Sequence, residues 1–154
     1  MLRNFVAIVV ALGFLSACQT KPVDTAGSAA GGAYAAGSQG DLAANAGDRV
    51  LFEFDSSSLN SEAQATLALQ AKWLEANPSV TAIVHGHCDE RGTVEYNLAL
   101  GERRANAAKE FLVNSGIDAS RLKAHSEGKE QPAVPEHDED AWRQNRRSVT
   151  VVNE

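Results

Sequence analysis

The chain has few cysteines, and their positions exclude a framework of disulfides. Only Cys18 and Cys88 are present in 154 residues. Small domains that depend on disulfides carry several pairs of cysteines. If Cys18 is modified, as its surroundings suggest below, Cys88 has no partner within the chain. The fold must therefore rest on a hydrophobic core.

Positive charge is also scarce. The 14 lysines and arginines are outnumbered by 20 aspartates and glutamates, which gives a net charge of −6. Binding to nucleic acid requires lysine and arginine to neutralise phosphates. The composition therefore excludes nucleic acid as a partner. The length allows one domain of ordinary size together with a tail.

The apolar run near the N-terminus is too short to cross a membrane. It extends from Phe5 to Leu15, whereas a spanning helix needs about 20 residues. Arg3 lies before it, and small residues follow it. A positive start, a short apolar run and a small-residue end are typical of a secretory leader, which we predict over residues 1–17.

The end of this leader, Leu15-Ser-Ala-Cys18, resembles the lipobox of bacterial lipoproteins. Small residues let a peptidase approach the backbone, and the thiol of Cys18 can form a thioether with diacylglycerol. The alternative is an ordinary leader with an incidental cysteine. We predict lipid attachment at Cys18, since several acyl chains, at about 0.8 kcal/mol per buried methylene, anchor firmly. Gln19 favours the outer membrane, because aspartate at that position favours retention in the inner one.

Two further segments follow the leader. Residues 18–47 are mostly glycine, alanine and small polar residues, which predicts a lipidated, flexible linker. A helix over part of residues 33–46 is the alternative. Residues 48–154 have the pattern of a folded domain, because apolar residues recur there at regular spacing.

Within this domain, segments of strand and helix character alternate. A capping box at Ser61-Glu-Ala-Gln64 favours a helix that begins at Asn60 or Ser61. We expect an α/β fold, an α+β sandwich in which a small mixed sheet packs against helices on one face. The expected strands are 50–54, 80–84, 122–126 and 148–152. The expected helices are one that starts at Asn60 or Ser61 and ends before Pro78, one over about 94–115, and a short turn near Trp142.

The densest polar stretch, His85 to Gly92, allows three interpretations. In the first, His85, His87 and Asp89 share one face of a strand and bind zinc, with the remaining ligand supplied from elsewhere. In the second, Cys88 is a nucleophile, although adjacent strand residues diverge and His87 cannot easily take its proton. Neither pattern is strong, so we predict that the chain is not an enzyme.

The third interpretation is ligand capture by Asp89 and Arg104. A helix that folds back beside its preceding strand brings the acid and the guanidinium to one cleft. The pair then suits a ligand with an ammonium and a carboxylate on one carbon. Spacing alone favours a simpler alternative, a direct salt bridge between Asp89 and Arg104.

Four motifs in this order resemble the OmpA-like peptidoglycan-binding domain family. They begin at Gly86-His-Cys-Asp-Glu-Arg-Gly, Leu100-Gly-Glu-Arg-Arg-Ala, Gly128-Lys-Glu-Gln-Pro and Asn145-Arg-Arg, and the similarity extends from about Arg49 to Val152. The resemblance implies non-covalent binding of the peptidoglycan stem peptide through meso-diaminopimelate, without a cofactor. Asp89 and Arg104 match the main recognition positions. Further groove positions are matched by Phe54, Asp55, Arg91, Asn97 and Leu100.

The resemblance also implies partners and a location. Lipid-anchored members of the family bind TolB, through a surface that overlaps this groove, and act in the Tol–Pal system in the periplasm. That system keeps the outer membrane attached and draws it inward at cell division. Four positions depart from the usual pattern, namely Glu53, Cys88, Gly101 and Glu127.

Overall fold

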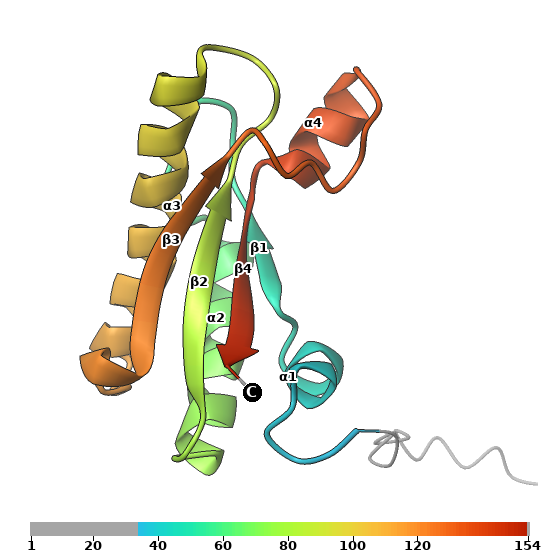
Figure 1. The fold of residues 1–154 in the computed structure, drawn as a ribbon. Coiled ribbons are helices and arrows are strands. Elements are labelled where there is room, and N and C mark those ends of the chain that lie inside the picture. The colour runs from blue at the N-terminus through green and yellow to red at the C-terminus, as the bar shows by residue number, and fades with distance from the viewer. Residues whose placement is uncertain (1–33, 154) are drawn as a thin grey trace, which may run out of the picture. The chain divides into compact units, whose positions relative to one another are not determined.

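The computed structural model describes residues 34–153, which form one sheet and its surrounding helices (Figure 1). The predicted leader, Cys18 and the first part of the predicted linker lie outside the described residues. In chain order the elements are α1 (Gln39–Asn45), β1 (Arg49–Leu51), α2 (Ser61–Ala76), β2 (Thr81–His87), α3 (Val94–Asn114), a 3-10 helix (Ala119–Arg121), β3 (Leu122–Gly128), α4 (Glu139–Asn145) and β4 (Arg147–Asn153).

The sheet is mixed, as predicted, with the strand order β1-β4-β2-β3. Strand β4 runs antiparallel to β1 and β2, and β2 pairs in parallel with β3 through the crossover helix α3. The first strand ends at Leu51 rather than at Phe54, and the chain soon turns through Asp55, whose φ is 52°. Strand β2 is longer than predicted and includes His85 and His87.

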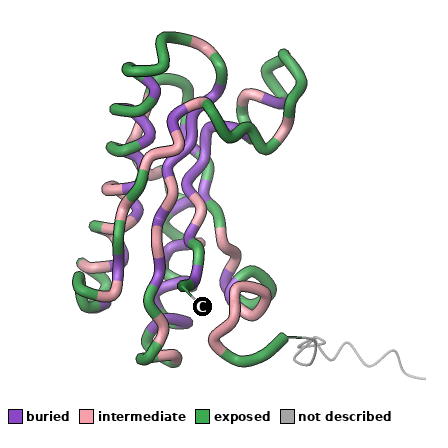
Figure 2. Tube along the Cα trace, viewed as in Figure 1, coloured by how far each residue is buried: buried purple, intermediate pink, exposed green. Residues whose placement is uncertain are grey.

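Helices α2 and α3 lie on the same side of the sheet and enclose the core (Figure 1). Helix α2 begins after Asn60, whose side chain accepts a hydrogen bond from the backbone of Ala63 at 2.8 Å. The capping box that begins at Ser61 was therefore wrong by one residue. Burial follows the inner sides of the helices and strands (Figure 2). Fully buried leucines fill this layer, each contributing about 1.5–3 kcal/mol, among them Leu67, Leu74, Leu112 and Leu122.

Two glycines bring α3 close to β2. A Cβ atom on Gly86 would lie 1.9 Å from the carbonyl oxygen of Gly101, so no larger residue fits between these elements. Gly101, one of the departures from the family pattern, thus has a packing reason. The same contact places Arg104, nearly one turn later on α3, beside the end of β2.

Helix α1 lies within the segment predicted as a linker and agrees with the alternative of a helix over part of residues 33–46. Ser38 caps the helix, and Leu42 is completely buried in the core. The indole nitrogen of Trp73 on α2 donates to the carboxylate of Asp41 at 3.0 Å. Gln39 also joins α1 to β4, because it accepts from the backbone of Val152 at 2.8 Å and donates to the carbonyl of Thr150 at 3.2 Å. Residues 39–45 therefore belong to the folded domain. No helix within residues 34–153 is long and apolar enough to span a bilayer.

Candidate functional site

A cavity of about 170 Å³ lies between the loop after β1, the loop after β2 and helix α3. Its position follows from the close contact of α3 with β2, which holds the two loops beside the helix. The seven groove residues expected from the sequence all line it, together with Cys88, Gly92 and Tyr96; they are Phe54, Asp55, Asp89, Arg91, Asn97, Leu100 and Arg104. The fold therefore brings together residues from three separate segments.

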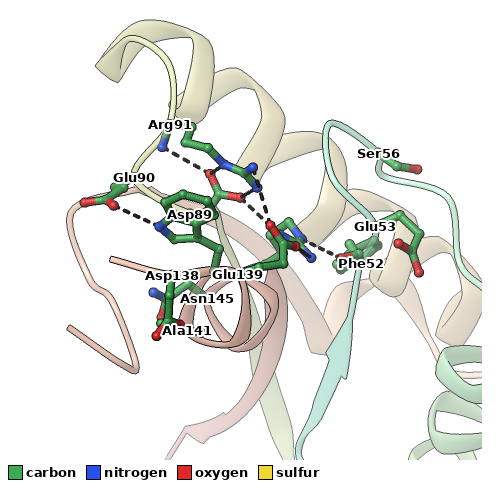
Figure 3. Close-up of polar contacts among 12 residues, drawn as sticks. Phe52, Glu53, Ser56, Asp89, Glu90, Arg91, Asp138, Glu139, Ala141 and Asn145 are labelled. Atoms are coloured by element: carbon green, nitrogen blue, oxygen red, sulfur yellow. Dashed lines mark hydrogen bonds and ion pairs between the residues drawn. The ribbon is translucent and has the colours of Figure 1, made fainter. Parts of the chain in front are cut away.

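Asp89 is buried at the end of β2 and is held by two arginines. Its Oδ2 atom accepts from Arg91 at 2.6 Å and from Arg146 at 3.4 Å, and its Oδ1 atom accepts from the backbone and Nε of Arg91. Asp89 and Arg91 face each other in Figure 3. Burial opposes ionisation, but the hydrogen bonds from Arg91 and Arg146 outweigh it and lower the pKa of Asp89. The site therefore holds a fixed negative charge.

Arg104 is the most buried cation of the site, with 1% of its surface exposed. Its guanidinium donates to three carbonyl oxygens, those of Ser56 and His87 at 2.8 Å and that of Glu53 at 3.0 Å. Among the described residues it forms no ion pair. The direct salt bridge with Asp89 is therefore wrong, because Arg91 and Arg146 occupy the carboxylate while backbone carbonyls orient Arg104.

Burial lowers the pKa of Arg104. A guanidinium has five N–H donors, of which three are used here, so two are left for a ligand. A buried cation that lacks a carboxylate partner and borders a cavity is suited to bind an anion.

Two aromatic rings hold Arg91 at the rim. Its guanidinium carbon lies 4.1 Å from the centre of the Phe54 ring and 4.2 Å from that of Trp142. Stacking of this kind stabilises a cation at a wet surface. The indole of Trp142 is fixed by a 2.8 Å hydrogen bond to Glu90, which lowers the pKa of that carboxyl group. Helix α4 thus supplies one wall around Arg91.

The remaining lining residues shape the cavity. Asp55 has a left-handed backbone, which is uncommon outside glycine and marks a constrained position. The Tyr96 hydroxyl donates to it, and this hydrogen bond raises the pKa of Tyr96. Asn97 is buried and donates to the backbone of Arg91, so it orders the loop after β2. Leu100 contributes a buried apolar surface.

The alternative chemistries of the polar stretch do not assemble. His85 and His87 line a different cavity from Asp89, so the three proposed zinc ligands do not converge. Cys88 is buried, and its thiol donates to the carbonyl of Asn97 at 3.4 Å. Burial raises the pKa of Cys88, which disfavours the reactive thiolate.

Three contributors to the site were not found from the sequence, namely Arg146, Glu139 and Trp142. Glu139 on α4 binds Arg146 at 2.8 Å and approaches Arg91 at 3.6 Å. Figure 3 shows Glu139 near Asp89 and Arg91. The motif Asn145-Arg-Arg was the available signal, but spacing alone does not show which arginine faces the cavity. In the structure, side chains alternate in direction around the start of β4, so Arg146 reaches Asp89 and Arg147 points to the opposite face.

Comparison with known proteins agrees with this architecture. The model of the OmpA family matches residues 51–146. A peptidoglycan-associated lipoprotein of Mesorhizobium japonicum is 49% identical, covering 98% of this chain and 93% of its own. A peptidoglycan-associated lipoprotein of Pseudomonas aeruginosa is 40% identical over 94% of this chain and 93% of its own.

Solved structures show the same fold. The peptidoglycan-associated lipoprotein of Burkholderia pseudomallei superimposes with a TM-score of 0.67 at 42% identity, covering 69% of this chain and 90% of that one. The C-terminal domain of Helicobacter pylori MotB has a TM-score of 0.65 at 21% identity, covering 70% of this chain and 84% of that one, and shows the fold alone. The fold is thus that of an OmpA-like domain. The chain belongs to the OmpA family and, within it, to the peptidoglycan-associated lipoproteins.

Proposed function

We propose that this protein is an outer-membrane lipoprotein, anchored through Cys18, whose folded domain binds peptidoglycan without a covalent bond. The names of its relatives support the class. The ligand is the free end of meso-diaminopimelate in the stem peptide, which carries an ammonium and a carboxylate on one carbon. The protein then links the outer membrane to the cell wall and is not an enzyme.

The observation that carries the proposal is the state of Arg104. It is a buried cation beside a cavity, without an acidic partner among the described residues, and with two donors unused. A ligand carboxylate satisfies both donors at once. Asp89 borders the same cavity and supplies the negative charge that an ammonium requires. The two groups therefore match the two charges of an amino-acid end.

The size of the cavity limits what enters it. A volume of about 170 Å³ lies below the roughly 300–1,000 Å³ of pockets that enclose drug-sized ligands. It accepts the end of one side chain, and the sugar strand stays outside. Modest affinity per site is sufficient, because many copies in one membrane face one polymer.

Binding requires Arg91 to move. The two oxygens of Asp89 already accept four hydrogen bonds, three of them from Arg91. A carboxylate offers about four acceptor sites, so the ligand ammonium must displace one donor. Arg91 is the more exposed partner, and Glu139 at 3.6 Å provides an alternative acceptor for it.

A protein partner at the same rim is the second candidate function. Four large apolar side chains are exposed there or nearby on α3, namely Phe54, Val94, Tyr96 and Leu98. Exposed apolar groups beside a polar cavity are typical of protein interfaces. We propose that this partner is TolB, within the Tol–Pal system that supports envelope integrity and outer-membrane invagination at division. Competition between TolB and a diaminopimelate-containing stem peptide tests whether the two surfaces overlap.

The site is tested by co-sedimentation of insoluble peptidoglycan with the chain from residue 19 onward. Arg104→Gln and Asp89→Ala are expected to lower the bound fraction to background. Arg121→Gln is the matched control, because Arg121 also donates to three carbonyl oxygens but lies away from the cavity. Retention by Asp89→Ala and Arg104→Gln equal to that of Arg121→Gln would contradict the assignment.

The anchor needs a separate experiment. Cells that express the full chain are labelled with palmitate, beside cells that express Cys18→Ala. We expect label and outer-membrane fractionation only for the unmodified chain. Equal labelling of both chains would exclude Cys18 as the attachment site and would leave the proposal for the wall site untouched.

A further inference from the structure

The face of the sheet that points away from α2 and α3 carries the opposite charge to the whole chain. Among residues 34–153 no helix covers this face over the middle of the strands (Figure 1). Ala82 and Val84 are buried toward the helices, so the alternate residues of β2 point the other way. Strand register extends this alternation to β1, β3 and β4.

The outward positions are rich in cations and imidazoles. They hold three permanent cations and three histidines but one carboxylate; the set is Arg49, Lys123, Arg147, His85, His87, His125 and Glu127. Glu127 is bound by His85 at 2.8 Å, and Arg49 is paired with Asp48 at 3.2 Å. Arg147 and Lys123 form no ion pair among the described residues. In a chain of net charge −6 this is a local basic face.

A cavity of about 570 Å³ opens on this face. It shares no lining residue with the cavity around Asp89. Basic and apolar side chains alternate in its wall, where Arg147, His85 and His87 lie among Val149, Val151, Pro132 and Ala133. Its volume falls within the roughly 300–1,000 Å³ that ligand sites commonly have.

Arg147 is the feature that points to a ligand. It is 8% exposed, yet the only hydrogen bonds of its side chain within residues 34–153 are long ones, to the carbonyls of Asn145 at 3.4 Å and Gln131 at 3.2 Å. Burial and the nearby Arg49 lower the pKa of Arg147, which shows that its charge is poorly compensated. The neighbouring His87 is 7% exposed, and its Nδ1 atom has no hydrogen-bond partner in the part of the chain that the structure describes.

We propose that this open sheet face binds an acidic polypeptide segment, with a side-chain carboxylate placed against Arg147. The guanidinium provides a fork for one carboxylate, and Lys123 and Arg49 lie on the same face for further acids. The apolar wall favours the aliphatic arm of a glutamate over a compact, strongly hydrated inorganic anion. This inference does not depend on the proposed wall function.

The probe is a labelled decapeptide of glutamate, with a decapeptide of glutamine as the uncharged reference. Fluorescence anisotropy at low ionic strength, where surface charge is least screened, measures binding to the chain from residue 19 onward. The glutamate peptide is expected to bind and the glutamine peptide is not. Arg147→Gln is expected to weaken binding about tenfold and Lys123→Gln about twofold, since one charge-assisted contact is worth roughly that.

Lys72→Gln is the matched control, because Lys72 is exposed on α2, on the other side of the sheet. It is expected to bind like the unmodified chain. Arg147→Lys keeps the charge and serves if Arg147→Gln fails to fold; amide NMR shifts on addition of the peptide must then map to β4 and β2.

Any of the following results would overturn the proposal. One is equal binding by the Arg147→Gln and Lys72→Gln variants, or peptide-induced shifts confined to the helix side. A second is complete displacement of the peptide by inorganic phosphate at equal concentration, which would assign the cavity to a small anion. The third is a dimer in sedimentation that Arg147→Gln dissolves, which would assign the face to a second copy of this chain.

Discussion

Two cavities, one between helix α3 and the loops after β1 and β2 and the other on the open face of the sheet, are each bordered by an almost completely buried arginine without an acidic partner among the described residues. Arg104 lies in the first and Arg147 in the second. The difference lies in the acids around them. Asp89 lines the first cavity and can accept an ammonium once Arg91 moves, whereas Glu127 in the second cavity is bound to His85 and shares the wall with a further cation, Arg49. The first cavity therefore suits a ligand with both charges, and the second an anion.

Two consecutive arginines connect the two regions: Arg146 caps the C-terminus of α4, and Arg147 is the first residue of β4. Arg146 binds Asp89, a lining residue of the first cavity, and Glu139, whereas Arg147 lines the second cavity. Alternation along an extended chain sends the two side chains to opposite faces. One pair of neighbouring residues thus contributes to two sites of different chemistry, and each site can be altered without the other.

Stability separates the two buried arginines most strongly. Arg104→Ala leaves three carbonyls without donors, one of them buried and two partly buried, and it is expected to cost about 3 kcal/mol in the free energy of unfolding. Arg147→Ala removes two bonds of 3.2 and 3.4 Å, and the expected loss is about 1 kcal/mol. Urea unfolding measures both. Equal losses would contradict the view that Arg104 is firmly held and Arg147 is not.

Asp89→Asn tests the charge that distinguishes the first cavity. Wall binding is expected to fall about tenfold or more, the scale of one charged contact. The pKa of Asp89 is lowered in the folded chain, so its ionised form stabilises the fold above the ordinary pKa of aspartate. This contribution is lost as the pH falls through the folded-state pKa.

Thermal unfolding of the parent and the Asp89→Asn variant at a series of pH values checks the sign. The parent is expected to be more stable at neutral pH, and the two curves to converge in acid. Curves that keep a constant separation down to strongly acidic pH would show that ionisation of Asp89 does not contribute.

The sequence predicted most of the fold because its elements are long and periodic. Strands β2 and β4 and helix α3 appear where alternation and helical spacing placed them. Helix α1 was assigned to the linker, because seven residues with a single buried leucine in a stretch of small residues give almost no periodic signal. Its stability comes from tertiary contacts, namely the burial of Leu42 and hydrogen bonds to Trp73 on α2 and to the backbone of β4.

The candidate site was predicted unevenly. Family motifs named its lining residues, but the partners of Asp89 could not be read from spacing, since Arg146 lies 57 residues away in sequence. The predicted salt bridge between Asp89 and Arg104 was wrong for the same reason. Tertiary packing, which spacing does not show, decides which of Arg91, Arg104 and Arg146 binds Asp89. The open face was missed entirely, since it depends on the register of four strands.

His87 makes the second cavity respond to pH. Burial first, and then the charge of Arg147, lower its pKa to about 4 from an ordinary 6.5. Between these two pKa values His87 is protonated in the unfolded chain but neutral in the folded one. The free energy of unfolding is therefore expected to fall as the pH is lowered from about 6.5 to about 4. The loss is on the order of 2 kcal/mol at the lower end. His87→Gln should remove this part of the pH dependence, and an unchanged profile in urea unfolding would show that His87 does not titrate there.

The smallest expected effect is the influence of one cavity on the other. The two share no lining residue, and a ligand shifts a distant equilibrium only by its differential affinity for two states. Saturating glutamate decapeptide is therefore expected to change the affinity of the domain for soluble stem peptide by less than about twofold. Calorimetric titration with and without the decapeptide measures this directly. A larger change that persists in Lys72→Gln but disappears in Arg147→Gln would show that Arg146 and Arg147 move together, and that β4 couples the two faces of the sheet.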